Sequence, residues 1–365
     1  MKKIVLRITL AACILLTSLV WGGSVYAQDE ELPDPGMTPD NPFYFLDGWG
    51  KSISLFFTFG DEVKAGKALR YAEERLSEAQ VMAAENRTRE MTRAANDFEG
   101  FMAMVNERLE AAAENGNSDN ISGELAGAAC RFHTWLGRIK DKLPEQSNET
   151  TREARATLET AETNTINSQI NALVMLGENR PERALDIGCE TVERLMERVR
   201  ARVSDNATGN TTRDISEILD YAARIAALED EMAAIAEEKG IDVTQIQTRL
   251  ARSSEVRLQT LSRVYENAPE AALNGIENAI ENSVKRYERV VERLRGTEAS
   301  AAVSANATAA LEDLPEKVKT RLHVENTLAA INRNRELPPA GPDNQEQNQP
   351  CPDNNNQGNN GEGKG

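Results

Sequence analysis

The stretch LVMLGENRPERALDIGCETVERLMERV, residues 173–199, recurs without gaps 88 residues later as LSRVYENAPEAALNGIENAIENSVKRY, residues 261–287. The two copies share nine identical residues, and their apolar positions coincide at alternating spacings of three and four. This spacing places apolar side chains on one narrow stripe of an α-helix, which suits helix-on-helix packing. Repetition of one helical unit predicts that similar elements stack. The stripe residues are Leu185, Gly188, Val192, Leu195 and Val199 in the first copy and Leu273, Ile276, Ile280, Ser283 and Tyr287 in the second.

Pairs of proline and glutamate mark where helices begin. Between residues 43 and 336 the chain holds four prolines, and glutamate follows each of them. Proline is tolerated in the first helical turn, where its missing N–H has no partner to lose, and a neighbouring carboxylate complements the positive end of the helix. We therefore expect helices to begin at Pro144, Pro181, Pro269 and Pro315.

The fold class follows from these patterns. Another amphipathic helix is expected from about residue 211 to Gly240, and no stretch of any length alternates with the period of two that a half-buried strand needs. The sequence predicts an all-α fold, either an antiparallel helical bundle or stacked helical hairpins, with coiled-coil-like packing. Helical periodicity alone is compatible with a rod and with a compact bundle.

The first 27 residues read as a secretory signal peptide. Basic residues precede an apolar run from Ile8 to Val20, and the small residues that the signal peptidase prefers end at Ala27. Two alternatives stay open: the apolar segment is retained as an anchor, or the chain is lipidated at Cys13, which lies in a lipobox-like LAAC. Each places the protein outside the cytoplasm, so we expect it to be extracellular, periplasmic or attached to the cell surface.

Composition divides the remainder of the chain. Residues 28–42 form a Pro-rich extended lead-in, 43–145 an N-terminal helical domain, and 146–336 a helical repeat region. Residues 337–365 are rich in Asn, Gln, Gly and Pro and hold too few apolar side chains to offset the entropy of ordering, so we expect a disordered tail.

The net charge excludes several kinds of partner. Lys and Arg number 42 against 59 Asp and Glu, a formal charge of −17, and removal of the three basic residues of the signal peptide would make it −20. A surface of this sign repels nucleic acid and anionic lipid, so we expect no nucleic-acid partner and membrane contact only through a retained anchor. Protein partners or self-association are expected, and weak cation binding is an alternative.

Seven aromatic residues gather near the start of a chain that is only 5% aromatic. We predict that they form a short amphipathic helix that acts as a clasp across the helix at Val63–Asn86, with Asp61 as the cap of that helix. The facing stripe would be Leu69, Ala72, Leu76, Ala79 and Met82. The alternatives are an exposed groove or knob that binds a partner, and insertion into a membrane surface. The cluster comprises Phe43, Tyr44, Phe45, Trp49, Phe56, Phe57 and Phe59.

The same segment carries a family resemblance. The motifs PFYFL (42–46), LFFTF (55–59) and YAEERLSEA (71–79) resemble the secreted-protein family called domain of unknown function 5667. The resemblance is strongest over residues 38–90 and fainter to about residue 143. It implies secretion and an all-helical body, and it brings no established activity, cofactor or catalytic residue.

Residues that could carry chemistry are sparse. His133 and His323 each lack a second ligand at helical spacing, and the carboxylates alternate with arginine as solvated helix faces. We expect no catalytic residue, no metal site and no cofactor. Cys130 and Cys189 could pair as a disulfide or remain buried thiols, and Cys351 lies in the tail.

Glycosylation is a further expectation for an exported chain. Six Asn-x-Ser/Thr sites occur, and two of them, Asn206 and Asn210, share the loop-like stretch SDNATGNTT.

Taken together, these features favour an exported, non-enzymatic helical protein that acts as a structural or protein-interaction module at the cell envelope. The alternative is an envelope binder or sensor of cations or of unfolded peptide partners, through acidic helix faces or an exposed aromatic groove.

Overall fold

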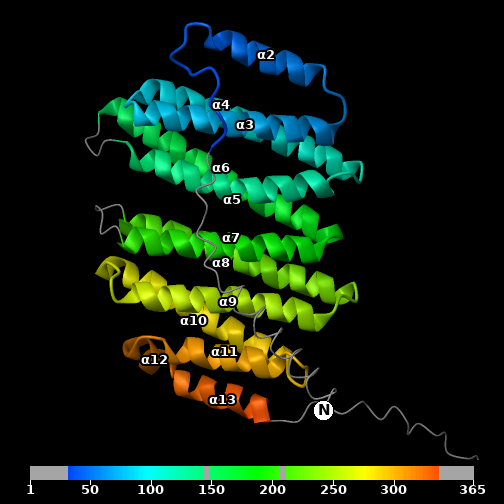
Figure 1. The fold of residues 1–365 in the computed structure, drawn as a ribbon, viewed down its shortest axis with the longest axis vertical. Coiled ribbons are helices and arrows are strands. Elements are labelled where there is room, and N and C mark those ends of the chain that lie inside the picture. The colour runs from blue at the N-terminus through cyan, green and yellow to red at the C-terminus, as the bar shows by residue number, and fades with distance from the viewer. Residues whose placement is uncertain (1–31, 144–147, 205–210, 337–365) are drawn as a thin grey trace, which may run out of the picture. The chain divides into compact units, whose positions relative to one another are not determined.

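The computed structural model describes residues 32–143, 148–204 and 211–336 (Figure 1). Over these residues the chain forms helices and no strand, so the predicted all-α fold is confirmed. The signal segment and the tail from residue 337 lie outside the described residues. The helices are α2 (Tyr44–Phe56), α3 (Asp61–Ala84), α4 (Thr88–Glu114), α5 (Asp119–Asp141), α6 (Glu149–Asn179), α7 (Pro181–Ser204), α8 (Thr211–Glu238), α9 (Val243–Tyr265), α10 (Glu270–Arg293), α11 (Ser300–Glu312), α12 (Glu316–Leu322) and α13 (Val324–Glu336).

The chain divides into two compact units. The first comprises Met1–Gly116 and Arg131–Thr165, and the second comprises Asn117–Cys130 and Ile166–Gly365. The division falls within α5 and α6, each of which contributes residues to both units. The domain boundary expected at residue 145 lies in the stretch 144–147, outside the described residues.

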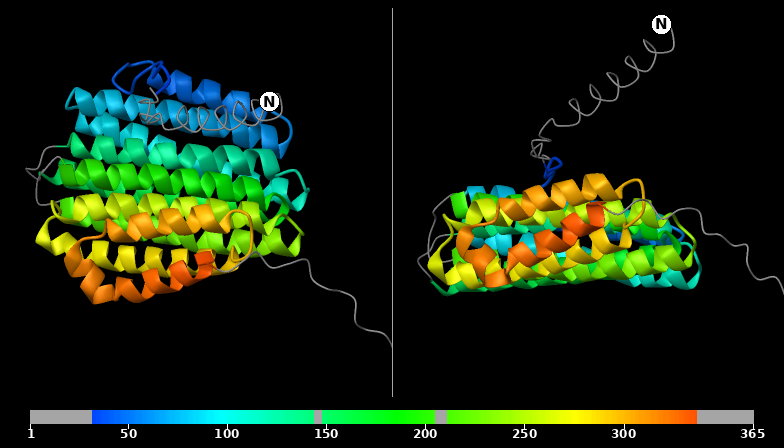
Figure 2. Two further views of the ribbon diagram at one scale, coloured as in Figure 1. Left: turned by 60° about the horizontal axis from the view of Figure 1, so that its bottom comes forward. Right: turned by 90° about the horizontal axis from the view of Figure 1, so that it is seen from below.

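In the second unit, helices pack against the next helix and the next but one. α7 packs on α8 and α9, and α10 packs on α8, α9 and α11. α7 to α10 lie side by side in the views of Figures 1 and 2. The repeated apolar stripe lies at these contacts: Leu185, Val192, Leu195, Val199, Ile276, Ile280 and Tyr287 are all at most 1% exposed. Packing of one repeated helical face against its neighbours therefore builds this unit, as the repeat predicted.

The expected helix boundaries are found at most positions. Pro181 is the first residue of α7, and Pro269 and Pro315 are the N-caps of α10 and α12. Pro144 lies outside the described residues. α8 begins at residue 211 as expected, and the chain turns after it at Gly240, whose φ of +76° lies in the left-handed region that glycine adopts at little cost.

The first unit is organised around the hairpin of α3 and α4, which pack against each other along their length. The expected facing stripe of α3 is buried: Leu69, Ala72, Leu76, Ala79 and Met82 are at most 7% exposed. α2 also lies on α3, over a smaller contact. Asp61 does not cap α3, because it is the first helical residue, and its carboxylate lies 3.4 Å from Arg108 of α4 instead.

Candidate functional site

The aromatic segment forms α2, but most of its aromatic side chains point to solvent. Phe56 is 77% exposed and Phe59 85% exposed, whereas Tyr44 is only 3% exposed. The prediction that these rings pack across α3 is therefore wrong for all but Tyr44. The exposed members, with two aliphatic neighbours, are Phe43, Phe45, Leu46, Trp49, Ile53, Phe56, Phe57 and Phe59.

A polar network explains this orientation, because α2 attaches to the body through hydrogen bonds. The hydroxyl of Tyr44 lies within hydrogen-bond distance of two carboxylates, 2.9 Å from Glu78 and 2.8 Å from Asp97, which share its one proton. Glu78 is fully buried on α3, and burial raises its pKa although Arg75 and Tyr44 both donate to it. A buried carboxylate needs such donors, since removing an ion from water without giving it partners costs on the order of several kcal/mol of folding free energy.

Arg75 connects this carboxylate to α2. Its guanidinium, 1% exposed, donates to Glu78 at 2.6 Å and also to Asp47 of α2. Lys51 of α2 lies 2.7 Å from Asp47 and 2.8 Å from Glu74. Burial alone would raise the pKa of Asp47, but hydrogen bonds from Lys51 and Arg75 outweigh burial and lower it.

Stacked cations add to the attachment. The guanidinium carbons of Arg75 and Arg93 lie 4.8 Å and 4.7 Å from the centre of the Tyr44 ring, within the range of cation–π attraction. The inward side of α2 therefore carries its Tyr, Asp and Lys residues together with Leu55. The outward side carries no charged residue and is mostly apolar; its large apolar side chains, which we call the α2 face, are Phe45, Leu46, Trp49, Ile53 and Phe56.

The predicted disulfide is absent. No disulfide joins Cys130 and Cys189 in the structure, which matches the alternative of two buried thiols. The sulfur of Cys189 lies 3.8 Å from the carbonyl oxygen of Arg249, and burial raises the pKa of both thiols. A protonated, buried thiol is a poor nucleophile and a poor metal ligand.

The remaining predicted residues are spread over the chain. Asn206 and Asn210 lie outside the described residues, as do Cys13 and Cys351. His133 is buried, and His323 ends α12 in a left-handed conformation. Among the described residues no group of three or more His, Cys, Asp or Glu side chains could hold a metal ion. No helix in the described part of the chain has the length and apolar character that a membrane span needs.

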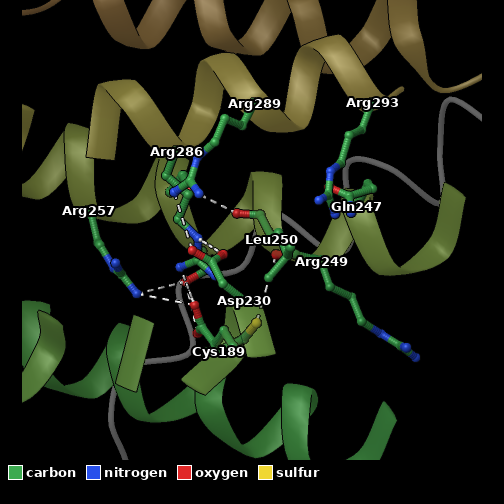
Figure 3. A network of polar contacts seen from close by, with 12 residues as sticks. Cys189, Asp230, Gln247, Arg249, Leu250, Arg257, Arg286, Arg289 and Arg293 are labelled. Carbon is green, nitrogen blue, oxygen red and sulfur yellow. Dashed lines mark hydrogen bonds and ion pairs between the residues drawn. The ribbon is translucent and has the colours of Figure 1, made fainter. Parts of the chain in front are cut away.

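The second unit contains a buried polar centre that the sequence did not indicate (Figure 3). Glu229 of α8 is 1% exposed and accepts hydrogen bonds from Ser253 and Arg257 of α9 and from Arg286 of α10. α7 approaches the same point through Gly188, where an added Cβ would lie 3.1 Å from the Cγ of Glu229. One carboxylate therefore joins three helices, and a glycine on the fourth leaves room for it.

Asp230, the next residue, extends this centre to the surface. Its carboxylate accepts from Arg286 at 2.8 Å and from Arg289 at 3.3 Å. Burial lowers the pKa of Arg257 to about 10, while Glu229 and Asp230 hold the pKa of Arg286 above its usual value although burial opposes them. One signal for this centre existed in the sequence: Arg286 is identical to Arg198 in the repeat.

Removal of the Tyr44 hydroxyl should loosen α2. We expect Tyr44→Phe to cost about 1–3 kcal/mol of attachment, because Glu78 then loses a donor in a buried position. Hydrogen exchange of the α2 amides should accelerate at least about fivefold while α7 to α10 are unchanged. Tyr71→Phe is the matched control, since it keeps the ring contacts with Phe101 and Lys51. Unchanged exchange in α2 would contradict the polar attachment.

Glu229→Gln should destabilise the second unit strongly. Two buried arginines would lose their shared anion, and breaking a buried ion pair from one side costs about 3–5 kcal/mol. Equilibrium unfolding in urea measures the loss. Glu190→Gln, which breaks an exposed pair with Arg194 on α7, should cost only about 0.5 kcal/mol or less. Equal costs for the two variants would show that Glu229 is not the centre of this packing.

Comparison with solved structures supports the fold. A protein described as "Circular tandem repeat protein with novel repeat topology and enhanced subunit contact surfaces" is similar at a TM-score of 0.55 and 14% identity, over 76% of this chain and 59% of that chain. A second, described as "Computational Design of Self-Assembling Cyclic Protein Homooligomers", is similar at a TM-score of 0.47 and 17% identity, over 75% of this chain and 99% of that chain. At this identity the first likeness shows a helical repeat fold and nothing about activity.

No curated protein matches the chain significantly. A family model does match, and it confirms the resemblance read from residues 38–90 while extending far beyond residue 143. It is described as "Domain of unknown function (DUF5667)" and covers residues 36–325, so the chain belongs to this family.

Proposed function

We propose that this protein is an exported, non-enzymatic structural module of the cell envelope, and that it pairs with a second copy of itself through the α2 face. The observation that supports the proposal is the orientation of α2: the helix is held by its polar side, and the helix and its flanking residues together expose six aromatic side chains to solvent. Monomeric soluble proteins rarely expose contiguous apolar patches of this kind, and such patches commonly mark interaction surfaces.

The spacing of the exposed apolar residues on α2 suits packing against another helix. Phe45, Trp49, Ile53 and Phe56 follow one another at intervals of four, four and three residues, as in amphipathic helices that pack along one apolar side. Trp49 is 67% exposed, so much of its ring area is open for burial. Two identical copies of such a side can meet about a two-fold axis, which is the commonest symmetry of protein dimers.

The charge distribution also favours a second copy of this chain as the partner of the α2 face. The chain carries a net formal charge of −17, so most contacts between two copies would bring like charges together. The outward residues of α2 are uncharged, and the charged residues of this helix, Asp47 and Lys51, are paired with each other and with α3. A contact through the α2 face therefore avoids the repulsion that opposes other contacts.

The assignment of a non-enzymatic role rests on what the buried charged groups do. Three buried glutamates each have a cationic partner. Glu78 is paired with Arg75 of its own helix and also accepts from Tyr44 of α2, Glu162 is paired with Lys140 of α5, and Glu229 is paired with Arg257 of α9 and Arg286 of α10. Their contacts hold helices together, which is a structural use of charge.

Export is part of the proposal and rests on the signal sequence. Mass spectrometry of the protein recovered from outside the cytoplasm should place the first residue at Gln28, after cleavage at Ala27. A chain that begins at a lipid-bearing Cys13 would support the lipoprotein alternative. A chain that keeps its first 27 residues would support the retained anchor. Recovery of the chain in the cytoplasm alone would contradict export.

Self-association through α2 can be measured directly. Sedimentation velocity of the chain beginning at Gln28 should show a monomer–dimer equilibrium, and Trp49→Ser combined with Phe56→Ser should weaken it at least about a hundredfold, since each buried aromatic side chain contributes roughly 1.5–3 kcal/mol. Val243→Ser, which removes an exposed apolar side chain from α9, is the control and should leave the equilibrium unchanged.

Two results would contradict the proposal: a monomer at all accessible concentrations, or a dimer that the double substitution leaves intact. A monomer that binds an extended apolar peptide, and loses this binding in the double variant, would support the second candidate function, a binder of unfolded chains. The exposed aromatic rings favour that candidate, while the helical spacing of the rings favours pairing between helices.

A further inference from the structure

The second unit contains a cleft that the proposed function does not use. It has a volume of about 580 Å³ and lies among α7, α8, α9 and α10. Clefts of roughly 300–1,000 Å³, mostly apolar with a few convergent polar groups, are typical of sites for small ligands. Its apolar lining comes chiefly from Ala222, Ala223, Ala226 and Ala227 of α8, with Leu219 and Leu261.

The charged groups of this cleft have the sign opposite to that of the chain. Arg257, Lys285, Arg286 and Arg289 line it, against two carboxylates, those of Asp230 and Glu288. In a protein with a net formal charge of −17, a recess in which cations outnumber anions is an exception. Low-dielectric walls strengthen the attraction of such a recess for an anion.

Two of these arginines are more than nine-tenths buried and are not fully satisfied. Arg257 is 6% exposed and its Nε finds no acceptor; Arg286 is 3% exposed and its Nη2 finds none. Arg257 donates to Glu229 through Nη2, and Arg286 donates to Glu229 through Nη1 and to Asp230 through Nε. Buried N–H groups are rarely left without acceptors, because they lose their hydrogen bonds to water without replacing them. An anion entering the cleft would supply acceptors where they are missing.

At the mouth of the cleft, Arg289 is available to a ligand. Its side chain is 66% exposed, and its ion pair with Asp230 is 3.3 Å long and lies at the surface. Solvent-exposed ion pairs contribute little to stability, so a ligand can displace this one at little cost. A planar guanidinium binds carboxylate and phosphate groups through two parallel hydrogen bonds.

We propose that this cleft binds an amphipathic anion, with an apolar chain along the alanines of α8 and a carboxylate or phosphate head group held by the arginines of α10. Because alanine side chains are small, they leave room for the apolar tail of the ligand. Its head group contacts the exposed Arg289 first, and the unsatisfied donors of Arg257 and Arg286 lie deeper. The site belongs to the second unit, whereas the α2 face belongs to the first, so it extends the function proposed above and does not depend on it.

Isothermal titration of the purified chain with decanoate tests the proposal. We expect one saturable site, with decanol binding at least about tenfold more weakly because it lacks the charge, and acetate not binding because it lacks the chain. Decyl phosphate, titrated in parallel, distinguishes the two head groups: the tighter of the two anions identifies the head group that the arginines prefer.

Variants place the binding in the cleft. Ala227→Phe fills the apolar side of the cleft, and Arg289→Gln removes the exposed cation. Each should weaken the binding of decanoate at least about tenfold. Ala227 and Arg289 are both exposed, so neither change disturbs the core. Ala234→Phe, on an exposed position of the same helix outside the cleft, is the matched control and should bind as the unaltered chain does.

Two outcomes would overturn the proposal. One is no binding of either anion up to about 1 mM, a concentration that still detects weak sites. The other is binding that Ala227→Phe and Arg289→Gln leave unchanged, which would place the ligand elsewhere, for example on the apolar rings of α2.

Discussion

Glu78 is the buried carboxylate on which the orientation of α2 depends. A carboxylate with no exposed area needs several donors, and here two come from different helices: the Tyr44 hydroxyl from α2 and the Arg75 guanidinium from α3. Arg75 in turn holds Asp47 of α2. Because these partners lie on the polar side of α2, that side turns inward and the apolar side is left to solvent. The usual arrangement of an amphipathic helix is thereby reversed.

The second unit also contains a buried carboxylate that accepts hydrogen bonds from neighbouring helices, and there it joins the helices of the repeat. Glu229 is buried where α8, α9 and α10 meet, and its donors come from α9 and α10, so the helices that form the repeat are tied at one point by charge as well as by apolar contact. Two arginines around one carboxylate leave N–H groups without acceptors beside a cleft. Stability and a capacity to attract anions therefore arise from the same residues.

Much of the fold could be predicted because its signals are local. The Pro-Glu pairs at residues 181, 269 and 315 and the glycine at 240 mark helix ends through backbone geometry, and the 3-4 spacing of the repeat marks buried faces. The direction of α2 could not be predicted from its own periodicity, which separates two faces without saying which is buried. That choice depends on Arg75 and Glu78, distant in sequence from Tyr44.

The buried polar centre of the second unit was hidden for a related reason. Glu229 is one of 59 acidic residues, and most of the others lie in Glu/Arg patterns that read as solvated helix faces. Whether a carboxylate is buried depends on which helices surround it, and pairing between distant helices leaves no local pattern. The absence of a disulfide between Cys130 and Cys189 is likewise a matter of tertiary geometry, since two cysteines on separate helices can pair but need not do so.

Fluorescence quenching of tryptophan tests the central claim most directly. After cleavage at Ala27 the chain holds two tryptophans: Trp49 on the α2 face, 67% exposed, and Trp135, 4% exposed, which serves as an internal reference. The account predicts that acrylamide quenches half of the tryptophan population readily in dilute protein, and that this accessible population becomes protected as the concentration rises and α2 faces pair. Protection of both tryptophans in protein that sediments as a monomer would contradict the account, because α2 would then pack its aromatic side against its own chain.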